Sequence, residues 1–353
     1  MQRRTHAWSL ALVALAIFCA PASRGRISMV RSIASLTAGA QVIVAGDVVK
    51  VEQVGVGETV DSAGNRYPAK KMAATIRVDD VLQGDVARAV IRVEYLQSES
   101  WEQGPETNAL YETYALLFLQ AEADHYGFSA PDSSWMRMSR NRAAVPRPPG
   151  PDAYTRVLQH LAAALFSLED TSKDRITAID GFQFEPSPIV TELFKRALDG
   201  PAAAVDTDLR LQLQAFLVGC KDTSLVPQVE AALFSSQDAR YSHARLSMIL
   251  ALQNVDPATA APILVRALKL PESELRRYAA IALKRTPGDI AIDGLLAALD
   301  DPDRDVQFQA MEALSYLVRE FQWRPSAIQQ DASWNRCLDH WRVFAAARKK
   351  VSP

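Results

Sequence analysis

The pattern of apolar residues changes once along this chain of 353 residues, close to Pro151. From about Ser35 to Ala130 the apolar positions either alternate with polar ones or form short β-branched runs, which predicts strands. These strands are expected at 42–51, 71–81, 89–96 and 111–120, with turn-forming residues at 61–65, 83–85 and 103–105. Several short strands at such intervals predict a small barrel or sandwich.

After Pro151 the apolar positions recur with a period near 3.6, which is typical of helices that bury one face. Helices are predicted at 153–168, 189–198, 208–219, 224–234, 238–253, 257–268, 272–284, 290–299 and 303–321. Two of these helices carry a clear start signal. Asp256-Pro257 and Asp301-Pro302 place a capping carboxylate and then a proline where a helix begins.

A repeat at a fixed spacing organises the last third of the chain. Ala251-Leu252, Ala282-Leu283 and Ala313-Leu314 lie 31 residues apart, and each pair closes a helical stretch. A shorter apolar helix precedes each of them. Self-similarity at this period predicts stacked helix pairs, in which a single pair does not bury its apolar face alone.

The best-defined repeat, 301–314, resembles the second helix of HEAT-like repeats of the short PBS-lyase type. It departs from the family pattern at Gln307, where arginine is usual, whereas the preceding repeat has Arg276 at that position. The resemblance implies an α-α superhelix over 152–322 that binds a protein partner through the second helix of each pair. The partner-binding residues that it implies are Arg240, Arg245, Arg276, Arg277, Asp305 and Gln309.

The strand-rich half also resembles a known module. The stretches 40–51, 76–85 and 114–119 are similar to the OB-like barrel of exported bacterial proteins, a relative of the netrin and TIMP modules. The resemblance implies a small antiparallel barrel over 30–135. Inhibition of the TIMP type uses an N-terminal cysteine to chelate a metal, and this region contains no cysteine. That mechanism therefore does not carry over.

Two further segments complete the expected domain organisation, which is a multidomain protein with α and β parts. Residues 136–151 contain several prolines and arginines, which predicts an extended linker between the domains. Residues 323–353 carry Trp334, Leu338, Trp341 and Phe344 at helical spacing. We expect this aromatic helix to cap the last repeat by covering its core.

The first 22 residues predict export of the protein. Arg3 and Arg4 precede the apolar stretch 7–19, and Ala20-Pro21-Ala22 has the small-x-small pattern of a secretory cleavage site. We therefore expect a periplasmic or extracellular protein without a membrane span in its mature chain. Removal of Arg3 and Arg4 takes Lys and Arg from 39 to 37 against 41 Asp and Glu. This balance argues against nucleic acid as a partner.

Candidate chemistry is sparse in the rest of the chain. No catalytic motif and no set of metal ligands stands out, so we expect neither an enzyme nor a cofactor. Cys337 and His340 supply only two of the three or four ligands that zinc requires. Cys220 and Cys337 either form one disulfide or remain separate thiols.

The sequence thus favours a monomeric, non-catalytic protein-binding scaffold of the cell envelope. Two alternatives stay open. The first is an enzyme or a protease-inhibitor-like module with its site in the barrel or at the domain junction, where Trp101, His125, Tyr126 and Trp135 are candidates. The second is a purely structural envelope protein.

Overall fold

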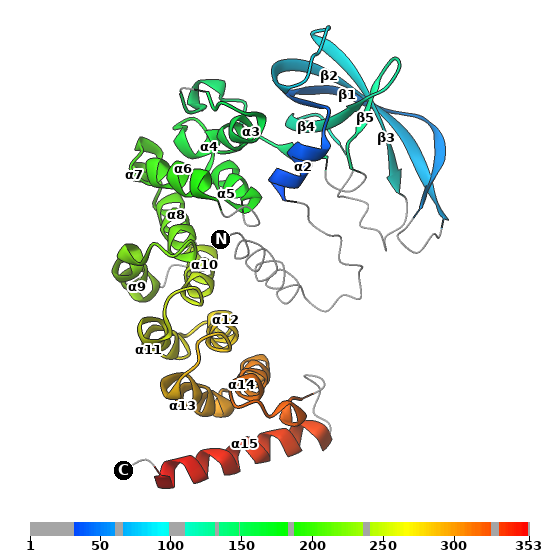
Figure 1. Cartoon of the computed structure of the whole chain (residues 1–353). Coiled ribbons are helices and arrows are strands. Elements are labelled where there is room, and N and C mark those ends of the chain that lie inside the picture. Colours follow the sequence, from blue (N-terminus) through cyan, green and yellow to red (C-terminus); the bar gives the residue numbers. More distant parts are fainter. Residues whose placement is uncertain are drawn as a thin grey trace, which may run out of the picture. The chain divides into compact units, whose positions relative to one another are not determined.

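The computed structural model describes residues 32–60, 66–98, 110–130, 134–147, 149–182, 187–235, 241–325 and 332–351. The chain divides into two compact units (Figure 1). We call Met1–Leu193 the sheet unit and Phe194–Pro353 the repeat unit. The predicted signal peptide at 1–22, Trp101 and Arg240 lie outside the described residues.

The sheet unit contains six strands. They are β1 (Val42–Val60), β2 (Arg66–Gln83), β3 (Val90–Ser98), β4 (Tyr114–Ala121), β5 (Tyr126–Phe128) and β6 (Trp135–Arg137). Their hydrogen-bonded order is β1-β2-β3-β5-β4-β6, and β1 also pairs with β4. All pairs are antiparallel except β3 with β5. The sequence predicted the first four strands, whereas β5 and β6 are too short to show a period.

The core of the sheet unit is built from two kinds of strand. The first six residues of β4 are all buried, while β2 mixes buried and exposed positions. β4 is buried on both faces because β1, β5 and β6 flank it and α2 (Ile33–Gly39) packs on it. Gly46 marks a close approach of β1 and β2, since a Cβ there would lie 2.3 Å from the Arg77 carbonyl oxygen. Only glycine fits such a contact.

Three short helices of the sheet unit follow the strands in the chain. They are α3 (Ala153–Leu161), α4 (Ala163–Phe166) and α5 (Ser172–Gly181). Asp152 caps α3 by accepting the Thr155 N–H at 2.8 Å, and Thr171 caps α5 through the Asp174 N–H. These caps satisfy amides that the first turn of a helix leaves unpaired. A single helix was predicted over 153–168, and α5 was not predicted.

The segment that was expected to be an interdomain linker, 136–151, is part of the sheet unit. It begins in β6 and contains a 3-10 turn, η2 (Arg142–Ala144). Arg142 donates to Asp80 of β2, and Asn141 donates to Ser167 at 2.7 Å. The division of the chain therefore falls at Leu193 and not at the prolines. Proline restrains the backbone, but the arginines between the prolines find acceptors on both sides.

The repeat unit is helical. Its helices are α7 (Pro201–Val205), α8 (Thr207–Gly219), α9 (Val226–Ser235), α10 (Ser242–Leu252), α11 (Pro257–Ala267), α12 (Ser273–Leu283), α13 (Asp289–Ala297), α14 (Arg304–Leu317) and α15 (Ala332–Val351), and α6 (Pro188–Leu198) spans the boundary. They stack in two rows (Figure 1). One row is α8, α10, α12 and α14, and the other is α9, α11 and α13. The fold is thus a six-stranded sheet followed by a helical repeat region.

The two predicted helix starts have different outcomes. Asp256 caps α11 by accepting the Thr259 N–H at 3.1 Å, with Pro257 in the first turn, as predicted. At the next site the prediction was wrong by two residues. Asp303 caps α14, whereas Asp301 lies outside that helix and accepts the Asp303 N–H. Asp301 is displaced from the cap because it pairs with a buried arginine, described below.

The C-terminal helix α15 completes the apolar core of the repeat unit. Trp334, Cys337 and Trp341 are buried in the same cluster as Val306 and Leu314 of α14. The Trp341 indole N–H donates to the Trp323 carbonyl oxygen at 3.1 Å, which satisfies its polar atom. Cys220 and Cys337 both remain thiols, so the disulfide alternative is not realised in this structure. Among the described residues, no helix is both long and apolar enough to cross a membrane.

Candidate interaction surface on the helical repeats

The row of helices α10, α12 and α14 exposes the same positions in every repeat. In each helix, four positions spaced i, i+3, i+4 and i+7 are at least partly exposed, while most of those between them are buried. We call these positions the repeat face. They are His243, Leu246, Ser247 and Leu250 in α10, Glu274, Arg277, Tyr278 and Ile281 in α12, and Asp305, Phe308, Gln309 and Glu312 in α14. This spacing places all four side chains on one side of a helix.

Two of the predicted partner-binding arginines do not lie on the repeat face. Arg245 is 1 % exposed and Arg276 is 9 % exposed. Arg276 forms a bidentate pair with Asp301 at 2.8 and 3.0 Å, and it also donates to the carbonyl oxygens of Leu270 and Pro271. The bond to Asp301 raises the pKa of Arg276. An arginine with its donors occupied inside the protein is not available to a partner.

Arg245 makes the equivalent contact one repeat earlier. Its guanidinium donates to Glu272 and, at 3.2 Å, to the Leu233 carbonyl oxygen. Each buried arginine therefore ties the second helix of one repeat to the loop before the second helix of the next. Gln307 occupies the same phase and bonds the Asp301 carbonyl oxygen at 2.7 Å. A neutral amide is sufficient there because it meets a carbonyl group and not a carboxylate.

This ladder of polar links, with its 31-residue phase, agrees with the comparison to known families. Residues 218–315 match the family model of HEAT repeats. The HEAT repeats therefore include α9 to α13 and most of α14. No curated protein matches the chain. Among solved structures, the chain is similar to the crystal structure of an engineered protein, Northeast Structural Genomics Consortium target OR329, with a TM-score of 0.31 and 14 % identity over 53 % of this chain and 96 % of that one. A similarity at this level carries no argument about function.

The remaining predicted residues do lie on the repeat face of the HEAT repeats. Arg277, Asp305 and Gln309 are all partly exposed. Arg277 approaches Asp305 of the next repeat at 3.9 Å and Glu274 of its own helix at 3.7 Å. Its guanidinium also lies over the Tyr278 ring, 5.0 Å from the centroid. These partners hold Arg277 flat along the surface.

Sequence reasoning missed the apolar part of the repeat face. Leu246, Tyr278 and Phe308 are partly buried side chains that pack on the core and still reach the surface. The 31-residue phase could have identified them, because Leu246 and Phe308 stand at the position of Arg277 in their own repeats. Partly exposed apolar residues beside charged ones are typical of surfaces that bind proteins.

The charged part of the repeat face is mainly acidic. Glu274, Asp305 and Glu312 face one arginine, Arg277. Lys284, at the edge of this face, neutralises Glu312 at 3.0 Å and lies 3.7 Å from the centroid of the Tyr316 ring. Two carboxylates thus remain more than 40 % exposed, Glu274 and Asp305. Among the described residues, no group of carboxylates, histidines and cysteines has the arrangement of a metal site.

The residues of the alternative hypothesis lie in the sheet unit and have separate environments. His125 bonds the neighbouring Asp124 at 2.7 Å and lies 3.1 Å from Glu122. Tyr126 belongs to β5, where it pairs with Val93. Trp135 begins β6, and its ring meets the Tyr111 ring edge to face at 5.5 Å. An imidazole surrounded by carboxylates is a surface ion cluster, and no nucleophile contacts it among the described residues.

Proposed function

We propose that this chain is a non-catalytic protein-binding scaffold that acts through the repeat face of its HEAT repeats. HEAT repeats are in general protein-interaction scaffolds. The observation that carries the proposal is the register of the repeat face. Three successive helices present the same four positions, so that a partner can contact them along the whole row.

The side chains of this face fit a partner of a definite character. Leu246, Tyr278 and Phe308 offer apolar contacts that are already fixed by packing on the core. Fixed apolar groups lose little conformational entropy on binding. The exposed carboxylates of Glu274 and Asp305 lie beside them and favour basic groups. The proposed partner therefore presents an apolar strip flanked by lysine or arginine.

The setting of this function is also a proposal. The basic and apolar N-terminal segment, followed by Ala20-Pro21-Ala22, supports export to the periplasm or beyond. We further propose that the sheet is an OB-like barrel. The pairing order β1-β2-β3-β5-β4, with β4 paired back to β1, supports closure of the sheet. In this view the barrel is a second module beside the scaffold.

A capture experiment with a face variant and a matched control tests the proposal. The full chain is immobilised and exposed to an envelope fraction, and the captured proteins are compared with those of Phe308→Asp. Ile290→Asp is the control, because Ile290 is 50 % exposed on α13 in the other row. We expect a protein that binds the original chain and the control but not the face variant. Equal capture by all three would contradict the proposal.

A further inference from the structure

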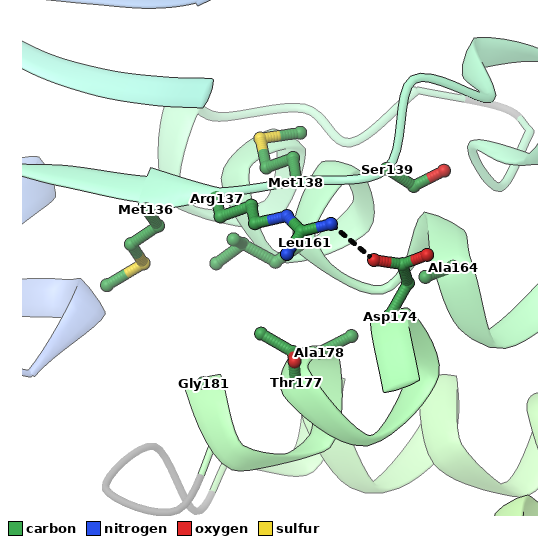
Figure 2. A pocket seen from close by; sticks show the side chains of 10 residues that line it. All are labelled: Met136, Arg137, Met138, Ser139, Leu161, Ala164, Asp174, Thr177, Ala178 and Gly181. Carbon is green, nitrogen blue, oxygen red and sulfur yellow. Dashed lines mark hydrogen bonds and ion pairs between the residues drawn. The ribbon is translucent and has the colours of Figure 1, made fainter. Parts of the chain in front are cut away.

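A second surface in the sheet unit carries an inference that goes beyond the repeat face. A pocket of about 210 Å³ lies between β6 and the helices that follow it (Figure 2). Its lining combines the end of the sheet with α3, α4 and α5. The residues are Met136, Arg137, Met138, Ser139, Leu161, Ala164, Asp174, Thr177, Ala178 and Gly181. Pockets for cofactors and drug-sized molecules usually measure about 300–1,000 Å³, so this one suits a single side chain.

The lining shows that the pocket lies along the edge of the sheet. Met136, Arg137 and Met138 are consecutive residues, and all three line it. Successive side chains of a strand point to opposite faces of a sheet, so a pocket on one face would be lined by alternate residues only. β6 is the last strand in the hydrogen-bonded order, and its one partner strand is β4. The pocket therefore faces the side of β6 that is turned away from β4.

The main chain of β6 has unused hydrogen-bonding groups on that side. The Met138 N–H donates to Tyr114 at 3.0 Å, and the Phe118 N–H donates to Ser134 at 2.8 Å. In an antiparallel pair these bonds alternate along the strand, so the N–H and C=O of Arg137 point away from β4. Among the described residues, no hydrogen bond uses the Arg137 main chain. An unpaired strand edge of this kind is a template for an added strand.

The charges at the pocket indicate what kind of chain fits. The Arg137 side chain reaches across to α5 and donates to Asp174 at 2.9 Å (Figure 2). Both side chains keep part of their surface exposed, 43 % for Arg137 and 25 % for Asp174. An anionic ligand would be repelled by Asp174 and a cationic one by Arg137. A neutral peptide group suits both, because its C=O accepts from the guanidinium and its N–H donates to the carboxylate.

We propose that the β6 edge binds an extended peptide of a partner protein, which adds one strand to the sheet. The peptide pairs with the main chain of Arg137 and inserts one apolar side chain between Met136 and Met138 on one side and Ala178 on the other. Methionine suits such a pocket because its flexible, polarisable side chain adapts to different occupants. The proposal does not depend on the repeat face, so the two surfaces can be tested separately.

The probe is a phage-displayed library of short random peptides, selected on the full chain and counter-selected on Ala178→Trp, which fills the pocket. We expect enriched peptides with one large apolar residue in an alternating pattern. Their synthetic forms should bind the full chain at least about tenfold more tightly than they bind Ala178→Trp, as judged by fluorescence anisotropy. Phe308→Asp should leave this binding unchanged, which separates the β6 edge from the repeat face.

Two variants at one position test the main-chain contact. Arg137→Ala keeps the outward N–H, whereas Arg137→Pro removes it without a loss to β4, which does not use that N–H. We expect Arg137→Pro to bind the peptides about three- to tenfold more weakly than Arg137→Ala, the equivalent of one lost hydrogen bond. Hydrogen exchange should also show protection of the Arg137 amide by the peptide in the unchanged chain, and circular dichroism reports the fold of each variant.

Three outcomes would overturn the proposal. The first is that no peptide is enriched relative to Ala178→Trp. The second is that the peptides bind Arg137→Pro and Arg137→Ala equally while the Arg137 amide stays unprotected. The third is that the full chain associates with itself through β6 and excludes peptides, which would make a second copy the occupant.

Discussion

The sheet unit and the repeat unit are held together by different uses of the same chemistry. In the repeat unit one link recurs: a buried arginine of one repeat meets an acid of the next, as in Arg245 with Glu272 and Arg276 with Asp301. In the sheet unit each polar link occurs once and joins segments far apart in sequence, such as Asp80 with His160. The difference shows that repetition makes a stabilising contact visible in a sequence, whereas a single long-range contact leaves no such trace.

The strongest test of this comparison removes one link of the ladder. Arg276→Ala leaves the Asp301 side chain, 7 % exposed, without its counter-ion. Breaking a buried pair by removing one partner costs about 3–5 kcal/mol. Gln307→Ala is the matched control, since it removes a neutral bond in the same phase and should cost about 0.5–1.5 kcal/mol. Urea unfolding followed by the helical dichroism measures both, and equal losses would contradict the ladder.

A slightly smaller effect is expected from the apolar part of the repeat. Leu283 and Leu314 are completely buried in the shared core. Leu283→Ala and Leu314→Ala should each cost about 2–5 kcal/mol, as truncations of buried leucine do. Gln309→Ala on the repeat face should change stability by no more than about 0.5 kcal/mol.

Hydrogen exchange on these variants locates the loss. Because each repeat contacts only its neighbours, Leu283→Ala should speed exchange first in α11 to α14. Uniform acceleration over α8 to α15 would show that the repeats unfold as one block.

The repeat region could be predicted because its signals are local and occur several times. The predicted helix over 272–284 is observed as α12, and the cap at Asp256 is confirmed. The function of individual arginines could not be predicted in this way. Arg276 and Arg277 are adjacent and chemically identical, yet one is buried against Asp301 and the other lies on the surface. Only the helical phase relative to the core separates them.

The sheet unit was less predictable because its contacts are long-range. The short strand β6 and the helix α5 gave no clear period, although together they form the pocket at the β6 edge. The prolines at 146–151 indicated a linker, but Gly150 there donates its N–H to the buried Gln159 of α3 at 2.7 Å. Such pairing depends on which distant segments the fold brings together.

A third test examines whether the sheet and α3 form one structure. Asp80 of β2 accepts from Arg142 of η2 and contacts His160 of α3 at 3.1 Å. Burial alone would raise the pKa of Asp80, but the bonds from Arg142 and His160 outweigh it and lower that pKa. Asp80→Ala should cost about 1–2 kcal/mol, because the carboxylate is about one third exposed and solvent screens part of its charge.

Hydrogen exchange should then show faster opening of α3. Asp85→Ala, in the exposed turn after β2, provides the control and should have no such effect. If Asp80→Ala proved as mild as Asp85→Ala, the segment 136–151 would behave as the linker that the sequence predicted.

The smallest expected effect concerns pH and the single links of the sheet. Glu94 of β3 accepts from Lys71 at 2.7 Å and from Arg92 at 2.9 Å, and these two bonds lower its pKa from 4.5 to about 2. Because the folded pKa lies below the unfolded one, the contribution of Glu94 is complete above pH 4.5 and is lost as the pH falls towards 2. Glu94→Gln should therefore be less stable than the original chain at neutral pH, by up to about 1 kcal/mol for an ion pair near the surface. The difference should shrink during acid titration and vanish near pH 2, as measured by urea unfolding at a series of pH values. Glu112→Gln, at an exposed position before β4, serves as the control for a general effect of charge. A gap that stayed constant down to pH 2 would mean that Glu94 stabilises β3 by packing and not by charge.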